Sequence, residues 1–189
     1  HCGSEIDTLS DILNIDKKKF FVFKHPDFPS EILDKNIAIE RLNKKYFKDQ
    51  LKADDKIFLM FGAIAEYKGI MEVIEIFKTL DERNKLVIAG FVKKGNHLYY
   101  NQIKNFADDK IFIEGSNIPD EDVPLFLNSA DYLIFNYSNI LTSGGVVLAM
   151  NYNKKIITPI LGCIKEIDYP HLIKFNRKNI TLEQVIHSL

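Results

Sequence analysis

The stretch "KIFLMFGAIAEYKGIMEVIEIFKTL", residues 56–80, contains the unit from which the fold is built. Its first part, 56–62, is a short apolar run without polar alternation, which predicts a strand buried on both faces. Its second part, 67–80, has apolar residues at the spacing of an amphipathic helix. A buried strand followed by a covering helix is typical of a βα unit in a parallel sheet.

The same pattern repeats along the rest of the chain. Strands are predicted at 85–90, 110–115, 131–135, 154–159 and 171–175, and helices at 97–107, 120–130, 143–151 and 181–189. Short strands without alternation, separated by helices, indicate a parallel sheet covered on both faces. We therefore expect an α/β fold with a doubly wound, Rossmann-like parallel sheet.

The segment before this stretch is less regular. Apolar spacing predicts a helix within 4–15, and "FFVF" at 20–23 predicts a short buried strand. Two prolines within 24–33 indicate a linker or turn. Residues 31–56 are rich in charge, and we expect them to be irregular or partly helical.

Composition restricts the class of protein. The chain has 189 residues, 46% of them hydrophobic, which predicts a globular core, and a net charge of -1, which does not suit a nucleic-acid binder. Cys2 and Cys163 are too few for a disulfide scaffold and suit a reducing, cytoplasmic setting. No apolar run reaches the ~18 residues of a membrane span. The chain begins without Met, and we expect it to be a piece of a longer protein.

Ligands of such sheets bind at the carboxyl ends of the strands, so the turns there are the candidate site. The candidate ligand-binding residues are Gly62, Ala63, Gly90, Asn117, Ile118, Leu141, Thr142, Ser143, Gly144 and Gly145. Residues 142–145 place two hydroxyls and two glycines at a predicted helix start, where free N–H groups attract phosphate. The alternative is structural, with Ser143 as an N-cap and the glycines allowing close packing.

Lys68 lies at the same end of the sheet, beside the start of the helix predicted at 67–80. A lysine there is electrostatically unfavourable unless an anion, such as a diphosphate, offsets it. The alternative is a solvated surface lysine.

Several motifs are absent. There is no GxGxxG, P-loop or GxSxG sequence, and the histidines are scattered, so we expect no cofactor and no metal. A basic run is broken by aspartates, which indicates a solvated helix face or, alternatively, a membrane-surface patch. The run consists of Arg41, Lys44, Lys45, Lys48 and Lys52.

The combined pattern resembles the GT-B glycosyltransferases of the large retaining "group 1" family, family 4. The resemblance rests on "FLMFGAIAEYKGIMEVIEIF", "KLVIAG", "IFIEGSNIPDEDVPLFLNSADYLIFNYS" and "LTSGGVVLAMNYNKKIITPILGCIKEI", and covers about residues 20–189. It implies the C-terminal, nucleotide-sugar-binding half of a GT-B enzyme. Residues 1–28 would then be a remnant of the N-terminal domain plus a linker, and 29–189 the donor-binding domain.

The resemblance also implies roles for individual residues. Lys68 matches the family lysine that contacts the donor diphosphate, which makes it the candidate catalytic residue, and Asn117 and Ile118 would lie against the base and ribose. The family's diphosphate-binding arginine has no counterpart, because residues 63–65 are Ala, Ile and Ala. The glutamate pair is also replaced, with apolar residues near Ile140 and at Leu148, and "LTSG" indicates a subgroup of the family.

The function implied is transfer of a hexose from a nucleotide sugar to a polysaccharide, lipid-linked or other glycan acceptor, without a metal. The missing N-terminal domain would bind the acceptor, and the full-length enzyme would associate peripherally with a membrane. This chain alone would bind donor without catalysing transfer. The alternatives are a catalytically inactive nucleotide-sugar-binding or scaffold module and another GT-B enzyme, such as a sugar-nucleotide 2-epimerase.

Overall fold

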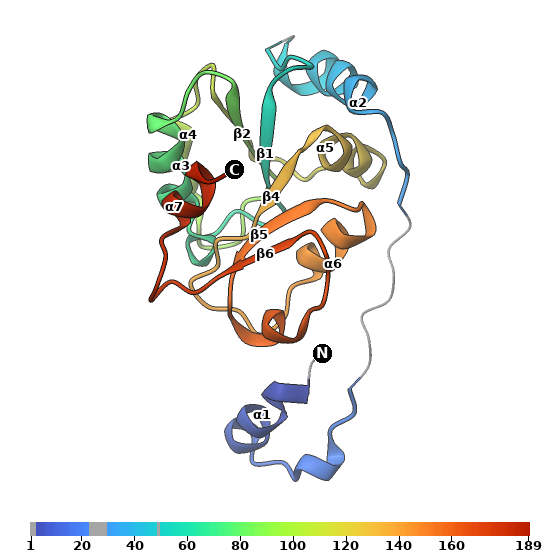
Figure 1. Ribbon diagram of the computed structural model, residues 1–189, viewed down its shortest axis with the longest axis vertical. Coiled ribbons are helices and arrows are strands. Elements are labelled where there is room, and N and C mark those ends of the chain that lie inside the picture. The colour runs from blue at the N-terminus through green and yellow to red at the C-terminus, as the bar shows by residue number, and fades with distance from the viewer. Residues whose placement is uncertain (1–2, 23–29, 49) are drawn as a thin grey trace.

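The computed structural model describes residues 3–22, 30–48 and 50–189 and contains one six-stranded sheet (Figure 1). The strands are β1 (Lys56–Phe61), β2 (Asn84–Ala89), β3 (Ile111–Glu114), β4 (Tyr132–Ile134), β5 (Lys155–Pro159) and β6 (Leu172–Phe175). They lie in the order β3-β2-β1-β4-β5-β6, and every neighbouring pair is parallel. The predicted doubly wound parallel sheet is confirmed.

A helix lies between each pair of consecutive strands except β5 and β6, which are joined through a 3₁₀ turn, and α7 follows β6. The helices are α1 (Ile6–Leu13), α2 (Lys35–Leu42), α3 (Ile70–Thr79), α4 (His97–Lys104), α5 (Val123–Ser129), α6 (Gly144–Asn151) and α7 (Leu182–His187). All four helices predicted between residues 67 and 151 are present, each within the range that the apolar pattern predicted.

The sheet is buried on both faces, which explains why its strands show no polar alternation. On β1, Ile57 and Leu59 pack into a core with α2, α5 and α6, while Phe58 and Met60 face the opposite core with α3, α4 and α7. Figure 1 shows these two groups of helices on opposite sides of the sheet. Neighbouring residues of a strand point to opposite faces, so both must be apolar.

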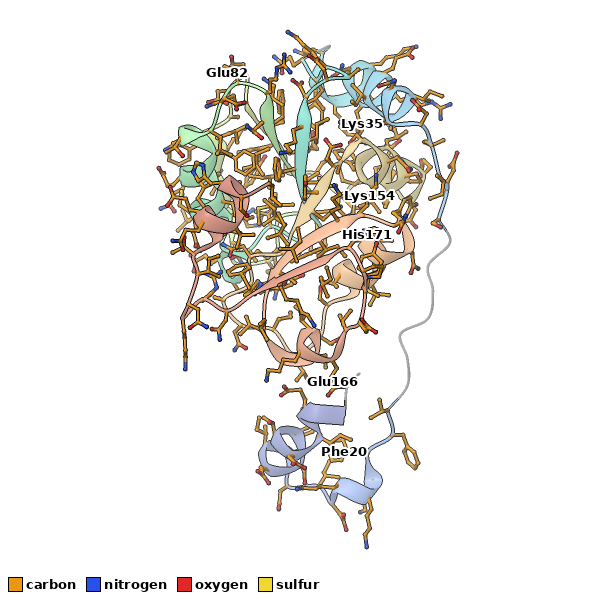
Figure 2. All side chains as sticks on the ribbon, viewed as in Figure 1. Phe20, Lys35, Glu82, Lys154, Glu166 and His171 are labelled. Carbon is orange, nitrogen blue, oxygen red and sulfur yellow. The ribbon has the colours of Figure 1, made fainter. Side chains whose placement is uncertain are left out.

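The N-terminal segment differs in part from expectation. The helix predicted within 4–15 is present as α1, but the strand predicted at 20–23 is wrong over its described part, because Phe21 is 78% and Val22 50% exposed. Figure 2 shows Phe20 beyond the end of the sheet, where no strand edge can pair with this run. The linker prediction at 24–33 and the domain boundary at residue 28 fall largely or wholly on residues 23–29, outside the described residues.

The charged segment 31–56 is partly helical, which is one of the two expected alternatives. It forms α2 and a π-helical continuation, Asn43–Phe47, and buries Ala38 and Leu42 on the α5 side of the sheet. The buried Asn43 joins this helix to the next segment, because its side chain hydrogen-bonds both backbone groups of Leu51.

Two observations concern the setting of the chain. Cys163 is disulfide-bonded, whereas the small number of cysteines had suggested a reducing setting. Within the described ranges, no helix combines the length and the apolar character needed to cross a membrane.

Candidate functional site

A cavity of about 340 Å³ opens at the carboxyl ends of β1 and β4. It is lined by the turn after β1, the loop after β4 and the first turns of α6. The lining residues are Phe61, Gly62, Ala63, Tyr67, Lys68, Tyr137, Ile140, Thr142, Ser143, Gly144, Gly145 and Leu148. The structure thus brings Lys68 together with the predicted phosphate-binding residues 142–145.

Lys68 is half-buried in this cavity, in a 3₁₀ turn that precedes α3. Its Nζ donates a hydrogen bond to the Phe61 carbonyl at 3.0 Å. Gly62 has a φ of +95°, and a Cβ there would stand 3.2 Å from the Lys68 Nζ. Glycine at this position therefore permits the positive φ of the turn and leaves room for the ammonium group of Lys68.

The ammonium group of Lys68 has an unusual electrostatic environment. Burial lowers the pKa of Lys68 to about 8. The ion pairs of the described residues do not include Lys68. At neutral pH the site therefore holds a positive charge that an incoming anion can neutralise.

Lysines at the other end of the sheet are satisfied differently. Lys35 and Lys154 lie there (Figure 2), and the Lys35 Nζ is 2.7 Å from an Asp131 carboxylate oxygen. Lys154 donates to the carbonyls of Asn128 and Ala130 at 3.2 and 3.0 Å. Lys35 thus joins the start of α2 to the residue before β4, and Lys154 joins the residue before β5 to the carboxyl end of α5, which is a structural role.

The start of α6 has two kinds of residue. Ser143 is the N-cap, because its Oγ accepts from the Val146 N–H at 3.2 Å and lies 2.7 Å from the Tyr137 hydroxyl. Burial raises the pKa of Tyr137 to about 12, so this hydroxyl stays protonated. A Cβ on Gly145 would approach Phe135 Cε1 to 2.9 Å. The structural interpretation therefore holds for Ser143 and for Gly145.

The rest of this helix start is available to a ligand. Gly144 is exposed and Thr142 half-buried, and both line the cavity. The first N–H groups of a helix have no partner within the helix, and Ser143 accepts only the third of them, from Val146. The N–H groups of Gly144 and Gly145 and the Thr142 hydroxyl can therefore bind an anion.

A larger cavity, of about 960 Å³, adjoins the first and shares Phe61, Gly62 and Leu148 with it. Besides Gly62, three of the predicted residues line it, namely Gly90, Asn117 and Ile118. Its remaining lining is largely apolar, with acidic side chains among it. These residues are Ser30, Glu31, Phe91, Asp120, Glu121, Val123, Pro124 and Tyr152.

Some residues were misplaced or missed by sequence reasoning. Leu141 lines neither cavity, and its carbonyl instead accepts from the Cys163 N–H at 2.8 Å. Tyr67 and Tyr137 stack at the smaller cavity with their rings 6.0 Å apart, and aromatic residues in a βα turn give no distinctive signal. Glu31 comes from the segment before α2, which no strand-end argument could place here.

Among the described residues, no group of three or more His, Cys, Asp or Glu side chains could hold a metal ion.

Comparison with protein families gives one match. The family described as "Glycosyl transferases group 1" matches residues 43–166, about two thirds of the chain. The matched region includes both cavity-lining turns and α6. No protein with a curated functional description matches the chain in sequence.

Several solved structures share the fold at low sequence identity. WaaG, a glycosyltransferase involved in lipopolysaccharide biosynthesis, has a TM-score of 0.72 and 14% identity, over 98% of this chain and 50% of WaaG. HepE of Anabaena, solved with UDP and glucose, has a TM-score of 0.62 and 14% identity, over 77% of this chain and 42% of HepE. The C-terminal domain of LpcC, a group 1 glycosyl transferase of Francisella tularensis, has a TM-score of 0.63 and 16% identity, over 87% of this chain and 85% of the LpcC domain.

These likenesses show a fold of the GT-B type. The chain spans less than half the length of HepE and half the length of WaaG.

Proposed function

Because the chain belongs to the group 1 glycosyl transferases, we propose that it is the C-terminal, nucleotide-sugar-binding half of a retaining enzyme of family 4. The observation that carries the proposal is the shared cavity of Lys68 and the α6 start. A cation and a helix N-terminus that face one space form a site for a diphosphate. The likeness to the LpcC C-terminal domain supports the assignment to this half.

The two adjoining cavities suit the two parts of a nucleotide. The smaller one, with Lys68 and the start of α6, would hold the diphosphate, and the larger, mostly apolar one would hold the base and ribose near Asn117 and Ile118. HepE was solved with UDP and glucose, which makes a uridine nucleotide with a hexose the first donor to test.

The chemistry proposed for this half concerns the leaving group. As the bond between sugar and diphosphate breaks, negative charge accumulates on the departing phosphate. Lys68 and the N–H groups of Gly144 and Gly145 would stabilise that charge, and a preorganised site of this kind lowers the barrier without moving a proton. No step in this proposal requires a metal.

The acceptor side of the reaction is assigned to a separate half of the enzyme. We propose that an N-terminal domain binds a polysaccharide, lipid-linked or other glycan acceptor, and that this chain alone does not catalyse transfer. We further propose that the whole enzyme associates peripherally with a membrane, and that the basic run from Arg41 to Lys52 contacts the membrane surface. The cytoplasmic location stays a prediction from the sequence, and the disulfide at Cys163 does not support it.

A catalytically inactive donor-binding module is the second candidate. It is favoured by the absence of an arginine at residues 63–65, so that Lys68 is the one cation lining the smaller cavity of the described structure. A 2-epimerase has less support, because that cavity is lined by no carboxylate and no histidine among the described residues.

Calorimetric titration tests the proposal. The chain is titrated with UDP-, GDP- and ADP-sugars and with the free nucleoside diphosphates, and one base series should bind. If none of them binds, the donor-binding proposal is wrong. Binding followed by no transfer, even in the complete two-domain protein, would identify the inactive module.

A further inference from the structure

Three polar side chains form a closed ring beside the turn that carries Lys68. Arg177 follows β6, Asn136 follows β4, and Glu72 lies in the first turn of α3. Arg177 donates from Nη1 to Glu72 Oε2 at 3.2 Å and from Nη2 to the Asn136 side-chain oxygen. Asn136 Nδ2 donates to the same Glu72 oxygen at 2.9 Å, which closes the ring.

The chemistry of the ring determines the orientation of the Asn136 amide. A guanidinium group has only donors, so the Asn136 atom that faces Arg177 must be Oδ1. The amide nitrogen then has two hydrogens, one for Glu72 and one for the Gly69 carbonyl, which lies at 3.1 Å. Asn136 is only 1% exposed, so each of these partners replaces a hydrogen bond to water.

The loop after β4 holds the backbone on both sides of Lys68. Asn136 binds the carbonyl of Gly69, and the Ser138 N–H donates to the carbonyl of Tyr67 at 2.8 Å. The contact at Gly69 is close, since this residue has a φ of +61° and a Cβ there would lie 2.6 Å from Asn136 Nδ2. The backbone position of Lys68 is therefore set by residues about 70 positions away.

The ring also engages a carboxylate that could otherwise pair with Lys68. Glu72 is the first carboxylate of α3 after Lys68, and only Gly69 and the first two residues of the helix separate them in sequence. In the structure Glu72 instead accepts hydrogen bonds from Arg177 and Asn136, and it forms no ion pair with Lys68. A Lys68 without a carboxylate partner can bind a ligand anion.

We propose that Asn136 and Arg177 are positioning residues for Lys68, which hold the turn at 67–69 so that its ammonium group faces the start of α6. Neither residue lines the cavity, so they act through Gly69 and Glu72. The consequence for donor binding rests on the function proposed above, whereas the placement of Lys68 can be measured without a ligand.

The ionisation of Lys68 reports its placement. Burial is what lowers its pKa to about 8, so a turn that loosens and lets water or Glu72 reach the amine will raise that pKa. The charged groups nearby include Glu66 in the same 3₁₀ turn, Glu72 on α3 and Arg177 after β6. Lys93 is also near, with its Nζ 5.2 Å from the Tyr67 ring centre. Tyr67 and Tyr137 are the titratable neighbours in the cavity.

Two variants test the proposal. Asn136→Asp replaces the amide nitrogen by a second acceptor, which faces the Glu72 carboxylate and the Gly69 carbonyl unfavourably. Arg177→Gln removes the cation from a side chain that is 37% exposed, so this variant should remain folded. The pKa of Lys68 is measured by carbon NMR of the labelled lysine Cε, with the resonance identified by its loss in Lys68→Arg. Binding of UDP is measured by calorimetry at pH 7.

We expect both variants to raise the pKa of Lys68 by about one unit or more toward its ordinary value. UDP binding should weaken about tenfold. Lys68 is protonated at pH 7 both in the parent and in a variant with a raised pKa. Weaker UDP binding by the variants therefore reflects the position of Lys68 and not its charge.

Matched substitutions elsewhere separate positioning from general destabilisation. Asn43→Asp makes the same change at another buried asparagine, whose Nδ2 donates to the Leu51 carbonyl at 2.7 Å. Arg83→Gln removes a cation from the exposed loop before β2. Neither should change the pKa of Lys68 or the affinity for UDP. If the folded Arg177→Gln and Asn136→Asp variants also keep both parental values, the positioning role is wrong. Failure of the parent to bind UDP, GDP and ADP alike would refute the proposed function alone, since the NMR measurement still decides the inference.

Discussion

At the scale of single residues, Lys68 is the centre of the candidate site. It combines a half-buried ammonium group, a single hydrogen bond to the Phe61 carbonyl and a cavity shared with the first residues of α6. Lysines at the opposite end of the sheet instead meet carboxylates or carbonyls that join strands. What distinguishes Lys68 is the cavity that its side chain shares with the start of α6, and the proposed ligand-binding role rests on that.

Lys68→Ala should weaken binding of the nucleotide sugar by about ten- to a hundredfold, since a hydrogen bond to a charged group contributes roughly 1.5–3 kcal/mol. The loss should shrink at high salt, because the removed interaction is electrostatic. Calorimetry at two ionic strengths measures both effects. Lys155→Ala, the same change of charge at the start of β5, is the control and should bind like the parent. Equal affinity of the Lys68→Ala variant would contradict the phosphate site.

Binding should also depend on pH. The pKa of Lys68 is lowered to about 8, so the ammonium form that attracts phosphate is present below pH 8 and is lost as the pH rises through that value. A bound diphosphate favours the charged form, and affinity should therefore decrease by up to about tenfold per unit above pH 8. Titrations of UDP from pH 6.5 to 9.5 measure the profile. The Lys68→Ala variant should show a flat one, and a flat parental profile would show that this charge is not used.

At the scale of elements, the two glycines at the start of α6 differ, with packing at one and the proposed binding role at the other. Gly145 faces Phe135, which is 2% exposed and cannot retreat, whereas Gly144 is exposed to the cavity. Ser143 starts the helix by accepting from Val146. One helix start is thus attached to the sheet on one side and open to a ligand on the other.

Valine substitutions at the two glycines should separate these roles. Gly145→Val should reduce the free energy of unfolding by about 1–3 kcal/mol, because the new side chain overpacks against Phe135. Gly144→Val should leave thermal stability nearly unchanged and weaken UDP binding at least about tenfold by obstructing the N–H groups, with little change in salt dependence. Thermal melts and calorimetry give the two readouts. A Gly144→Val protein that binds normally would leave the glycine pair with a packing role only.

At the scale of the whole molecule, the parallel sheet explains how one end becomes a binding site. All six strands have the same direction, so the turns after β1, β2, β3 and β4 open to the same edge, where both cavities lie. The amino ends carry the structural lysines instead. The proposed donor site lies at this edge of the chain, and the proposed acceptor half lies elsewhere.

The isolated chain should bind the donor and release no nucleoside diphosphate from it. The physical reason is that the cavity stabilises a leaving group but holds no second reactant, so the reaction lacks the proximity that accelerates transfer. A coupled assay for UDP, run for hours with UDP-glucose, measures release, and the complete two-domain protein serves as the positive control. Release by the isolated chain at a comparable rate would show that the acceptor half is not needed.

Much of this could be predicted from sequence. Apolar strands without alternation predicted a sheet buried on both faces, and such a sheet is parallel because covering helices must connect its strands. Since the carboxyl ends of parallel strands meet at one edge, Lys68 and residues 142–145 could be placed together before any coordinates. The local alternatives at Ser143 and Gly145 could not be resolved, because they depend on which partners the hydroxyl and the missing side chain meet.

Only the tertiary structure decided the contacts between distant segments. Nothing in the sequence indicates that Arg177 reaches Asn136, 41 residues earlier, or that Asn136 in turn holds Gly69, 67 residues earlier. Likewise, the apolar run at residues 20–22 resembles a buried strand but is largely exposed, since no strand edge lies beside it. The spacing of apolar residues indicates which side of a segment must be buried. Which other segments bury it is set by the order of the strands in the sheet and by the packing of the loops between them.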